Sequence, residues 1–459
     1  MLDFSKLKKI YFIGIKGSGM VALAEIFKRW RVEVIGSDTK EKFFTDEILK
    51  KLEIDFYDNF DAAHIAENPD IDLVVYSTAY NETNNPEFKA AKETGLHIIS
   101  YPELLGKLFN KKFGIAVCGT HGKTTTTAML ADIMRIAEFD PTAVVGSKVI
   151  QWRSSALAGR SEFMVIEADE YQGKFKYYDP KAVILTSVDW DHPDFFENYG
   201  EYKSIFEKFV AKIPLHGFLV VCGDRSDTLE IAKSAKCKVI TYGFGLDCNL
   251  RIKDYELKEG KQFFSLWFNE KKLGRFDLSL PGRHNVLNTA AAVAAAYQFN
   301  AGAEKMRRAV SEFEGTSRRF EYIGRRNGAI LIDDYAHHPE EIKVTLRAAR
   351  DFFPRKKIWC VFQPHTYTRT KALLEDFAQS FEDADNVIIL DIYGSAREEQ
   401  GVAHSKDLVE RASRYHRNIK YIPTIGEVVD YLSDKIGSDD LVITMGAGNV
   451  LEAGEKLKE

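Results

Sequence analysis

The chain has 459 residues, and at roughly 150 residues per domain this length predicts about three domains. Its 63 Lys and Arg residues stand against 68 Asp and Glu residues, so the net charge is −5 and the basic excess of a general nucleic-acid or anionic-membrane binder is absent. A hydrophobic content of 45% with 29% charged residues excludes a largely disordered chain. We therefore expect a globular, multidomain protein with neither a nucleic acid nor a membrane as its partner.

The cysteines and the apolar runs indicate the compartment. No two of Cys118, Cys222, Cys237, Cys248 and Cys360 have Cys-x-x-Cys spacing, which argues against a disulfide framework or zinc site and favours a reducing environment. The first residues become apolar only where a strand would begin, so they do not resemble a signal peptide. No run of about eighteen apolar residues is present, so we expect no membrane-spanning helix. The sequence thus predicts a soluble, cytoplasmic protein.

Short apolar runs alternate with longer helical patterns along the whole chain, and most of the runs end in a Gly, Ser, Asp or Thr turn. This rhythm is typical of βα units in parallel sheets, in which functional loops follow the carboxyl ends of the strands. It predicts an α/β fold with domains over residues 1–110, 111–315 and 316–459. A stretch of alternating pattern within 251–282 predicts a β-meander in the second domain.

The first glycine-rich loop, FIGIKGSGM, lies between a predicted strand and a predicted helix and contains Gly14, Gly17 and Gly19. Ser37 and Asp38 follow the next strand, where a ribose-binding acid would lie. The spacing is Gly-x-x-Gly-x-Gly and differs from the dinucleotide fingerprint. It favours a nucleotide diphosphate over a dinucleotide, and a purely structural turn is the alternative.

The second glycine-rich loop, GTHGKTTT, runs from Gly119 to Thr126 after the strand GIAVC and before an apolar helix. Backbone N–H groups and the helix N-terminus would face phosphate oxygens there. Lys123 would reach the β- and γ-phosphates and the Thr124 hydroxyl could ligate Mg²⁺. The loop is two residues shorter than the usual phosphate-binding motif, and a turn that only caps a helix is the alternative. The loop predicts ATP binding.

Two acidic segments, VIEADE and SVDWDHPD, follow apolar strands in the same domain. Several carboxylates gathered at one sheet edge would repel one another unless a cation lay among them. They predict a Mg²⁺ site, with solvated helix-capping acids as the alternative. The candidates are Glu167, Asp169, Glu170, Asp189, Asp191, His192 and Asp194.

Further polar residues follow strands later in the chain. Asn285 and Asn288, after His284 in PGRHNVLN, either approach an adenine edge or cap a helix. Arg319 and Arg369 either bind carboxylate or phosphate in bidentate fashion or lie at the surface. The segments IDDYAHHPEE and FQPHTYTRT hold the remaining candidates, and the adjacent histidines are as consistent with a structural role as with a ligand role. These candidates are Arg318, Asp333, Asp334, Tyr335, His337, His338, His365 and Tyr367.

The motifs GIKGSGM, GTHGKTTTT, EADE, DWDH, GRHNVLNTAAA, RRFE, DDYAHHPEE and FQPHTYTRT occur in an order that resembles the Mur ligases of peptidoglycan synthesis. The third-domain motifs resemble the branch that adds L-alanine. The resemblance implies a Rossmann-like N-terminal domain for the UDP-sugar, a central P-loop ATPase-type domain with a mixed sheet, and a Rossmann-like C-terminal domain for the amino acid. It also implies ATP, Mg²⁺ and small-molecule substrates.

The family's site residues carry over by motif. Catalytic roles fall on Lys123, His192, Arg319 and His365, and metal ligation on Thr124, Glu167 and His192. ATP binding falls on Gly119, Thr120, His121, Gly122, Lys123, Thr124, Thr125, Asn285, Asn288, Arg319 and Asp334. UDP-sugar binding falls on Gly17, Ser18, Ser37 and Asp38, and amino-acid binding on Tyr335, His365 and Arg369.

The sequence departs from the family pattern in four places. EADEYQGKF replaces EADESD-x-SF, Ser187 replaces Asn, Asp189 replaces Glu, and Thr366 replaces Arg. The ATPase core is therefore better supported than the identity of the amino acid. The EADEY spelling leaves open a ligase that joins recycled murein tripeptide to UDP-N-acetylmuramate.

The implied reaction joins L-alanine to the carboxylate of UDP-N-acetylmuramate through an acyl phosphate, in cell-wall synthesis that supports cell shape and division. Either His192 or His365 would take the amine proton. Water exclusion would need domain closure with hinges near residues 110 and 315. We expect a monomer or a homodimer. A P-loop switch protein and a dinucleotide redox sensor fit the three-domain motif order less well.

Overall fold

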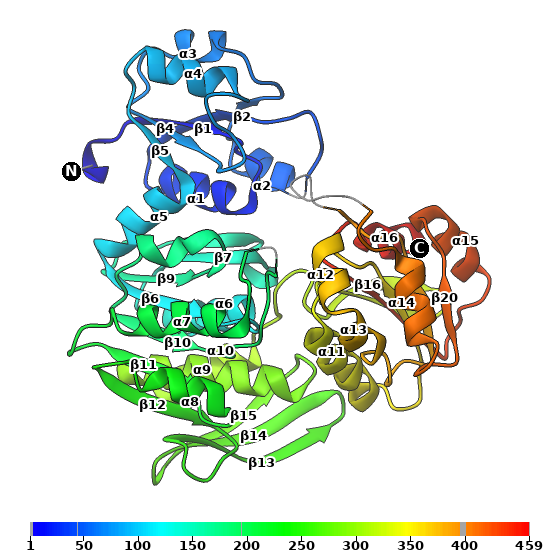
Figure 1. Ribbon diagram of the computed structural model, residues 1–459. Helices are drawn as coiled ribbons and strands as arrows, with labels where there is room; N and C mark the ends of the chain where they lie inside the picture. Colours follow the sequence, from blue (N-terminus) through cyan, green and yellow to red (C-terminus); the bar gives the residue numbers. More distant parts are fainter. Residues whose placement is uncertain (1–2, 44, 194, 395–400, 459) are drawn as a thin grey trace.

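The computed structural model describes residues 3–43, 45–193, 195–394 and 401–458, so the candidate Asp194 lies outside the described residues. The chain forms three sheets, each flanked by helices, in the order N-terminal, central and C-terminal (Figure 1). This is the three-domain α/β fold that the sequence predicts. The boundaries at 110 and 315 stay a prediction.

The N-terminal sheet has five parallel strands in the order β3-β2-β1-β4-β5. Helices α1, α2 and α5 contribute to the core on one face, and α3 and α4 cover the other. The strands are β1 (Lys9–Ile13), β2 (Glu33–Ser37), β3 (Phe56–Tyr57), β4 (Leu73–Tyr76) and β5 (Ile98–Ser100). The helices are α1 (Ser18–Arg29), α2 (Thr45–Lys51), α3 (Ala63–Ala66), α4 (Pro86–Glu93) and α5 (Tyr101–Asn110).

The central sheet has ten strands in the order β15-β14-β13-β12-β11-β10-β6-β9-β7-β8 and is mixed, as predicted. Its strands are β6 (Phe113–Cys118), β7 (Thr142–Val149), β8 (Ser154–Ala158), β9 (Phe163–Glu167), β10 (Ala182–Leu185), β11 (Phe218–Cys222), β12 (Lys238–Gly243), β13 (Leu250–Lys258), β14 (Lys261–Phe268) and β15 (Lys271–Leu278). Strands β13 to β15 pair antiparallel, which confirms the predicted β-meander.

Helices cover both faces of the central sheet. One face packs against α6, α9 and α10, and the other against α7 and α8. Their bounds are α6 (Lys123–Ile136), α7 (Tyr199–Val210), α8 (Ser226–Ala232), α9 (Arg283–Gln298) and α10 (Ala303–Ser311). Because β6, β9, β10 and β11 are parallel neighbours, their carboxyl ends meet at one edge of the sheet, where the polar loops gather.

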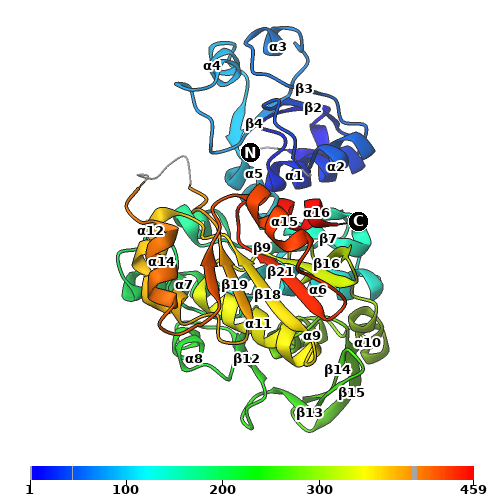
Figure 2. The ribbon, with the colours of Figure 1, turned by 90° about the vertical axis from the view of Figure 1, so that its right-hand side faces the viewer.

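The C-terminal sheet has the order β16-β17-β21-β18-β19-β20, parallel except for β16 (Figure 2). Helices α11, α13 and α14 contribute to the core on one face, and α15 and α16 on the other. The strands are β16 (Glu321–Arg326), β17 (Ala329–Asp334), β18 (Lys357–Phe362), β19 (Asn386–Ile389), β20 (Ile419–Tyr421) and β21 (Asp440–Met445). The helices are α11 (Pro339–Phe352), α12 (Tyr367–Ala372), α13 (Leu374–Ala378), α14 (Ser405–Ala412), α15 (Ile425–Ser433) and α16 (Leu451–Leu457).

The two domain interfaces differ in character. A single apolar cluster runs from Ile10 in the N-terminal domain to Ala232 in the central domain, and α1 packs on β7 and β8. The C-terminal domain has its own apolar clusters, against which Trp190 of the central domain packs. The described contacts across this second interface are largely polar, as the site below shows.

The remaining sequence predictions concern cysteines and membranes. All five cysteines are free thiols. No helix in the described part of the chain is both long and apolar enough to cross a bilayer.

Candidate functional site

The phosphate-type loop joins β6 to α6 and is held by the neighbouring strand end. Gly122 precedes the helix in a left-handed conformation with φ 78°, and a Cβ there would lie 2.4 Å from Asn288 Oδ1. A Cβ on Gly119 would lie 2.3 Å from Thr186 Oγ1. Both glycines are therefore required by close packing. The Thr120 N–H donates to the Ser187 carbonyl at 2.8 Å, which ties the loop to the end of β10.

Lys123 is folded back onto its own loop. Its Nζ donates to the Gly119 carbonyl at 2.6 Å and to the Thr120 carbonyl at 3.1 Å, and it lies 3.4 Å from Glu170 Oε2. Burial alone would lower the pKa of Lys123, but the charges of Glu170 and other nearby carboxylates outweigh it and raise the pKa. The site thus holds a permanently charged ammonium at the phosphate loop.

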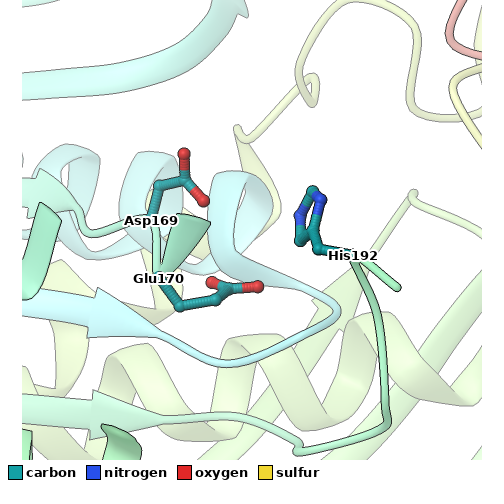
Figure 3. A group of neighbouring side chains, drawn as sticks. All are labelled: Asp169, Glu170 and His192. Atoms are coloured by element: carbon teal, nitrogen blue, oxygen red, sulfur yellow. The ribbon is translucent and has the colours of Figure 1, made fainter. Parts of the chain in front are cut away.

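Two groups of oxygen ligands lie beside this loop. The Thr124 hydroxyl donates to Glu167 Oε1 at 3.0 Å, so the structure brings together two of the three predicted metal ligands. The third, His192, groups instead with Asp169 and Glu170, with ligand atoms within 4.8 Å of one another. Figure 3 shows the His192 ring opposite the two adjacent carboxylates. The hydroxyl and carboxylate oxygens of Thr124 and Glu167 fit the preference of Mg²⁺ for oxygen ligands.

Lysines neutralise both members of the carboxylate pair. Lys174 forms an ion pair with Asp169. Burial would raise the pKa of Asp169, but Lys174 and Lys123 lower it. Glu170 is fully buried and accepts a hydrogen bond from the Tyr202 hydroxyl at 2.8 Å, and burial raises its pKa. A cation bound among these acids would therefore compete with two lysine ammonium groups.

A cavity of about 320 Å³ lies between the central and C-terminal domains and begins at the phosphate loop. Eight of the predicted ATP-binding residues line it, drawn from three distant parts of the chain: His121, Gly122, Thr124, Thr125, Asn285, Asn288, Arg319 and Asp334. Asn285 and Asn288 are joined by a 3.1 Å hydrogen bond on the first turns of α9. The remaining predicted members, Gly119, Thr120 and Lys123, lie in the loop itself.

The C-terminal domain places charged groups on the far wall of this cavity. Asp334, at the end of β17, accepts hydrogen bonds from the backbone N–H groups of Phe320 and Ala336, both at 2.8 Å. Burial raises the pKa of Asp334 to about 6. The Arg319 guanidinium lies 5.2 Å from the Tyr335 ring centroid and 3.7 Å from Glu341 Oε1. Arg319 thus faces the phosphate loop from the opposite domain.

Arg369 and His365 lie together at the same interface. Arg369 donates to Asp191 Oδ1 of the central domain through Nε at 3.0 Å and Nη2 at 2.9 Å, and its Nη1 lies 3.3 Å from His365 Nδ1. Asp191 is buried, which would raise its pKa, but Arg369 holds the pKa of that carboxyl well below its usual range. The His365 ring stacks on Tyr393 and lies 6.2 Å from the His337 ring.

The four predicted UDP-sugar residues of the N-terminal domain differ in their surroundings. Gly17 and Ser18 begin α1 at the loop. Ser37 is fully buried and its hydroxyl donates to the buried Glu87. Asp38 Oδ2 accepts the Lys16 backbone N–H at 2.7 Å, so Asp38 holds the glycine-rich loop in place.

The structure explains two of the family departures. The Ser187 hydroxyl accepts the His121 backbone N–H at 3.0 Å, so it supports the phosphate loop. Asp189 lies 3.3 Å from His121 Nε2 and accepts Arg225 Nη2 at 2.7 Å. Burial would raise the pKa of Asp189, but these two cations lower it to about 2. Thr366 has φ 67°, an uncommon conformation for a β-branched residue, and its N–H donates to Tyr393.

Sequence reasoning missed several residues of the cavity wall. Asp224, Arg225 and Tyr242 come from the ends of β11 and β12, while Glu341 and Thr345 come from α11. The turn GDRSD after the apolar strand FLVVC has the same strand-then-polar pattern as the segments that were recognised, and it could have indicated Arg225. Glu341 ends the segment IDDYAHHPEE, but its position in the first turn of α11 indicated only a helix-capping acid.

The three sheets, the phosphate loop and the cavity between two domains define a multidomain P-loop protein of the α/β class. Comparison with models of known protein families identifies the family. Residues 9–113 match "Mur ligase family, catalytic domain", residues 117–296 match "Mur ligase middle domain", and residues 318–448 match "Mur ligase, glutamate ligase domain". The chain therefore belongs to the Mur ligase family and is an ATP-dependent amide ligase, as the resemblance implied.

Individual relatives cover the whole chain. The UDP-N-acetylmuramate–L-alanine ligase of Caldanaerobacter subterraneus subsp. tengcongensis is 40% identical over 461 residues, which span 100% of this chain and 99% of the relative. The enzyme of the same name from Desulfitobacterium hafniense is 39% identical over 98% of this chain and 99% of the relative. The solved UDP-N-acetylmuramate–alanine ligase of Thermotoga maritima has 26% identity and a TM-score of 0.80, with 98% of both chains covered. A murein peptide ligase from Psychrobacter arcticus, at 24% identity and a TM-score of 0.72, covers 98% of both chains and shares the fold.

Proposed function

We propose that this protein joins L-alanine to the carboxylate of UDP-N-acetylmuramate with ATP, as a step of peptidoglycan precursor synthesis that supports cell shape and division. The observation that carries the proposal is the cavity in which the phosphate loop, Asn285, Asn288, Arg319 and Asp334 meet. Curated relatives that match over the whole chain support the choice of substrates. We propose a cytoplasmic enzyme, monomeric or homodimeric, with small-molecule substrates alone.

The chemistry explains why such a site is needed. An amine cannot expel oxide from a carboxylate, so the muramoyl carboxylate first attacks the γ-phosphorus of ATP, which forms an acyl phosphate and releases ADP. The deprotonated amine of L-alanine then attacks the acyl carbon. The tetrahedral intermediate collapses with loss of inorganic phosphate and leaves an amide. Both steps build negative charge on phosphoryl oxygens, which fixed cations and N–H groups stabilise.

The residues of the cavity supply those functions. The loop N–H groups from Gly119 to Thr125 would hold the ATP phosphates, and the Lys123 ammonium would neutralise charge on the transferred group. Asn285 and Asn288, at the start of α9, would contact the adenine. Arg319 would contact the phosphates from the C-terminal domain. Beside it, Asp334 accepts the backbone N–H groups of Phe320 and Ala336 and so orders both segments.

Two neighbouring groups of residues would hold Mg²⁺ in this proposal. Thr124 and Glu167 would hold one ion, and His192, with Asp169 and Glu170, a second. When bound, Mg²⁺ would neutralise phosphate oxygens of ATP. Glu167 is held in place by a second contact, because its Oε2 accepts the Gly146 N–H at 2.8 Å.

The acceptor side lies around Arg369. Tyr335, His365 and Arg369 would contact the amino acid and the muramoyl carboxylate, and either His192 or His365 would take the amine proton. At the other end of the substrate, Gly17, Ser18, Ser37 and Asp38 would form the UDP-sugar loops. Since Ser37 donates to Glu87, its contribution would be to shape the loop.

The alternative acceptor is a recycled murein tripeptide. Tyr171, which departs from the family's usual Ser, stacks on His192 with ring centroids 4.5 Å apart. It therefore places an aromatic side chain at the metal site, where it can shape the acceptor pocket. Two solved murein peptide ligases share the fold.

Phosphate release tests both acceptors in one assay. Purified protein with ATP, Mg²⁺ and UDP-N-acetylmuramate should release phosphate when L-alanine is added, and much more slowly with glycine, L-serine or the tripeptide. A tripeptide rate above the L-alanine rate would select the alternative. UDP-N-acetylmuramate and ATP should each raise the Tm while NAD should not, since only ligands of the native state stabilise it. No phosphate release with any acceptor would refute the ligase.

A further inference from the structure

The side chain of His121 has no assigned role beyond its place in the phosphate loop. Its backbone is fixed on both sides, because its N–H donates to Ser187 Oγ at 3.0 Å and its carbonyl accepts the Thr186 hydroxyl at 2.6 Å. These two hydrogen bonds fix the backbone from which the imidazole extends. It points toward the C-terminal domain, where its ring lies 5.0 Å from that of His338.

Each ring nitrogen of His121 faces a carboxylate from a different domain. Nε2 lies 3.3 Å from Asp189 Oδ2 of the central domain, and Nδ1 lies 3.2 Å from Glu341 Oε1 of the C-terminal domain. The Nδ1 contact with Glu341 is a hydrogen bond, whereas the Nε2 contact with Asp189 is a close polar contact without hydrogen-bond geometry. The imidazole therefore lies between one carboxylate of each domain.

Both carboxylates are themselves held in place. Arg225 Nη2 donates to Asp189 Oδ1 and to Asp227 Oδ2, each at 2.7 Å. Glu341 Oε2 accepts the backbone N–H groups of His337 at 3.0 Å and His338 at 3.3 Å, which fixes it at the N-terminus of α11.

The contacts form one chain of alternating charge: Asp227, Arg225, Asp189, His121, Glu341 and Arg319. His121 is the link at which this chain passes from the central to the C-terminal domain. The last member, Arg319, lines the cavity opposite the phosphate loop.

We propose that the His121 side chain is a positioning residue, which bridges Asp189 and Glu341 and so fixes the C-terminal domain and Arg319 against the phosphate loop. The effect on turnover rests on the proposed function. The bridge itself does not, because it exists between residues of the protein alone.

The experiment compares His121→Gln, Glu341→Gln and the double variant with a matched control, His216→Gln, which changes an exposed histidine far from the interface. Glutamine at 121 is uncharged and presents both N–H donors from one nitrogen, so it does not reproduce the two ring nitrogens that face opposite carboxylates. Glutamine at 341 keeps an oxygen that accepts the α11 N–H groups and loses only the charge. The variants should therefore fold, which a Tm within a few degrees of wild type would verify.

Hydrogen exchange of residues 337–346, without any ligand, gives a readout that is independent of the reaction. We expect exchange in this segment to be at least fivefold faster in His121→Gln than in wild type, with the control unchanged. Exchange within twofold of wild type would overturn the bridge, whatever reaction the protein catalyses.

Turnover then tests the positioning role. His121→Gln should lower kcat by about 10- to 100-fold while the KM for ATP stays within about threefold, because Lys123 and the loop N–H groups remain. The double variant should be no more than about threefold slower than the slower single variant. A kcat within twofold of wild type, or losses that multiply in the double variant, would overturn the positioning role. Absence of wild-type turnover would refute the proposed function and leave the exchange result to decide the bridge.

Discussion

Lys123 shows how a single residue joins the fold to the chemistry. Its ammonium satisfies two carbonyl groups of its own loop and lies beside the fully buried Glu170. In this arrangement it stabilises the loop and also presents a fixed positive charge where phosphoryl transfer would occur. The charged form is held by the neighbouring carboxylates across the physiological pH range.

Replacing Lys123 by Met keeps the length of the side chain and removes the charge. We expect ADP production to fall by about 10²- to 10³-fold, which is typical for loss of one fixed group that stabilises transition-state charge. A coupled assay for ADP measures the change. Lys176→Met, in the same domain, is the matched control and should retain turnover. If Lys123→Met kept more than a tenth of the wild-type rate with the same Tm, the loop would not be the phosphate site.

His121 makes stability depend on pH in a defined window. Burial alone would lower its pKa, but the neighbouring carboxylates of Asp189 and Glu341 raise it from 6.5 to about 9. A raised pKa contributes stability that is fully present below pH 6.5 and is lost as the pH rises through about 9, by about 3 kcal/mol at most. Burial lowers the pKa values of the neighbouring histidines His284, His337 and His338, so they stay neutral across the window. The pKa values of Asp189 and Glu341 are lowered, so both stay ionised there.

Calorimetry of wild type and His121→Gln therefore has a clear expected result. The Tm difference between the two proteins should be largest at pH 6 and should shrink toward zero as the pH approaches 9.5. A difference that did not vary with pH would mean that His121 is neutral in the folded protein.

At the residue scale, local motifs were enough to predict which polar residues come together at the cavity. Gly122, Thr124, Asn285 and Asn288 were all expected at the nucleotide and all line the cavity. The contact of His121 with Glu341 could not be predicted, because it depends on how a helix of the third domain approaches the second. The contact of Ser37 with Glu87 was equally beyond local motif, since it depends on the packing of α4.

At the scale of elements, the contact of α5 with the segment Tyr171–Tyr177 links the N-terminal domain to the metal site. A Cβ on Gly106 of α5 would lie 2.6 Å from the Tyr177 carbonyl oxygen, a backbone atom that cannot move freely. The same segment carries Lys174, the partner of Asp169. The absence of a side chain at Gly106 therefore lets α5 approach the segment that follows the carboxylate pair.

Gly106→Ala should destabilise the protein by about 1–3 kcal/mol, because an inserted methyl group must displace backbone. Gly302→Ala is the matched control: a Cβ there meets no atom within 4 Å, so its effect should stay within about 0.5 kcal/mol. Thermal unfolding of the two variants side by side measures the difference. Equal Tm values for both variants would show that α5 can move away from the segment Tyr171–Tyr177 without a loss of stability.

The elements themselves were the easiest part to predict. Alternating apolar runs and turn residues indicated the βα units and the β-meander, because periodicity is a local property of the chain. The order of the strands was not accessible in the same way. That β6 lies between β9 and β10, with β7 and β8 beyond, results from packing between residues far apart in sequence.

At the scale of the whole molecule, the difference between the two interfaces favours motion at one of them. The N-terminal and central domains share an apolar cluster, and the buried Glu25 of α1 bonds to Ser154 of β8 across the boundary. The central and C-terminal domains instead meet through ion pairs around the cavity. Since polar contacts can exchange for ligand or water contacts, we expect the hinge near 315 to open before the one near 110.

The Asp191–Arg369 pair is the contact at which this opening can be tested. Both side chains are buried, so removing one charge leaves the other unpaired, at a cost of about 3–5 kcal/mol for the paired state. If the domains separate, water can hydrate Arg369. Separation then costs less free energy than keeping an unpaired guanidinium buried. In Asp191→Asn we therefore expect a larger radius of gyration in ligand-free small-angle scattering and a kcat at least tenfold lower. Asp179→Asn, an exposed acid of the same domain, should match wild type in both measurements. If Asp191→Asn gave the wild-type scattering curve, the pair would be a local contact and the C-terminal domain would be held by other means, with the His121 bridge as the first to examine.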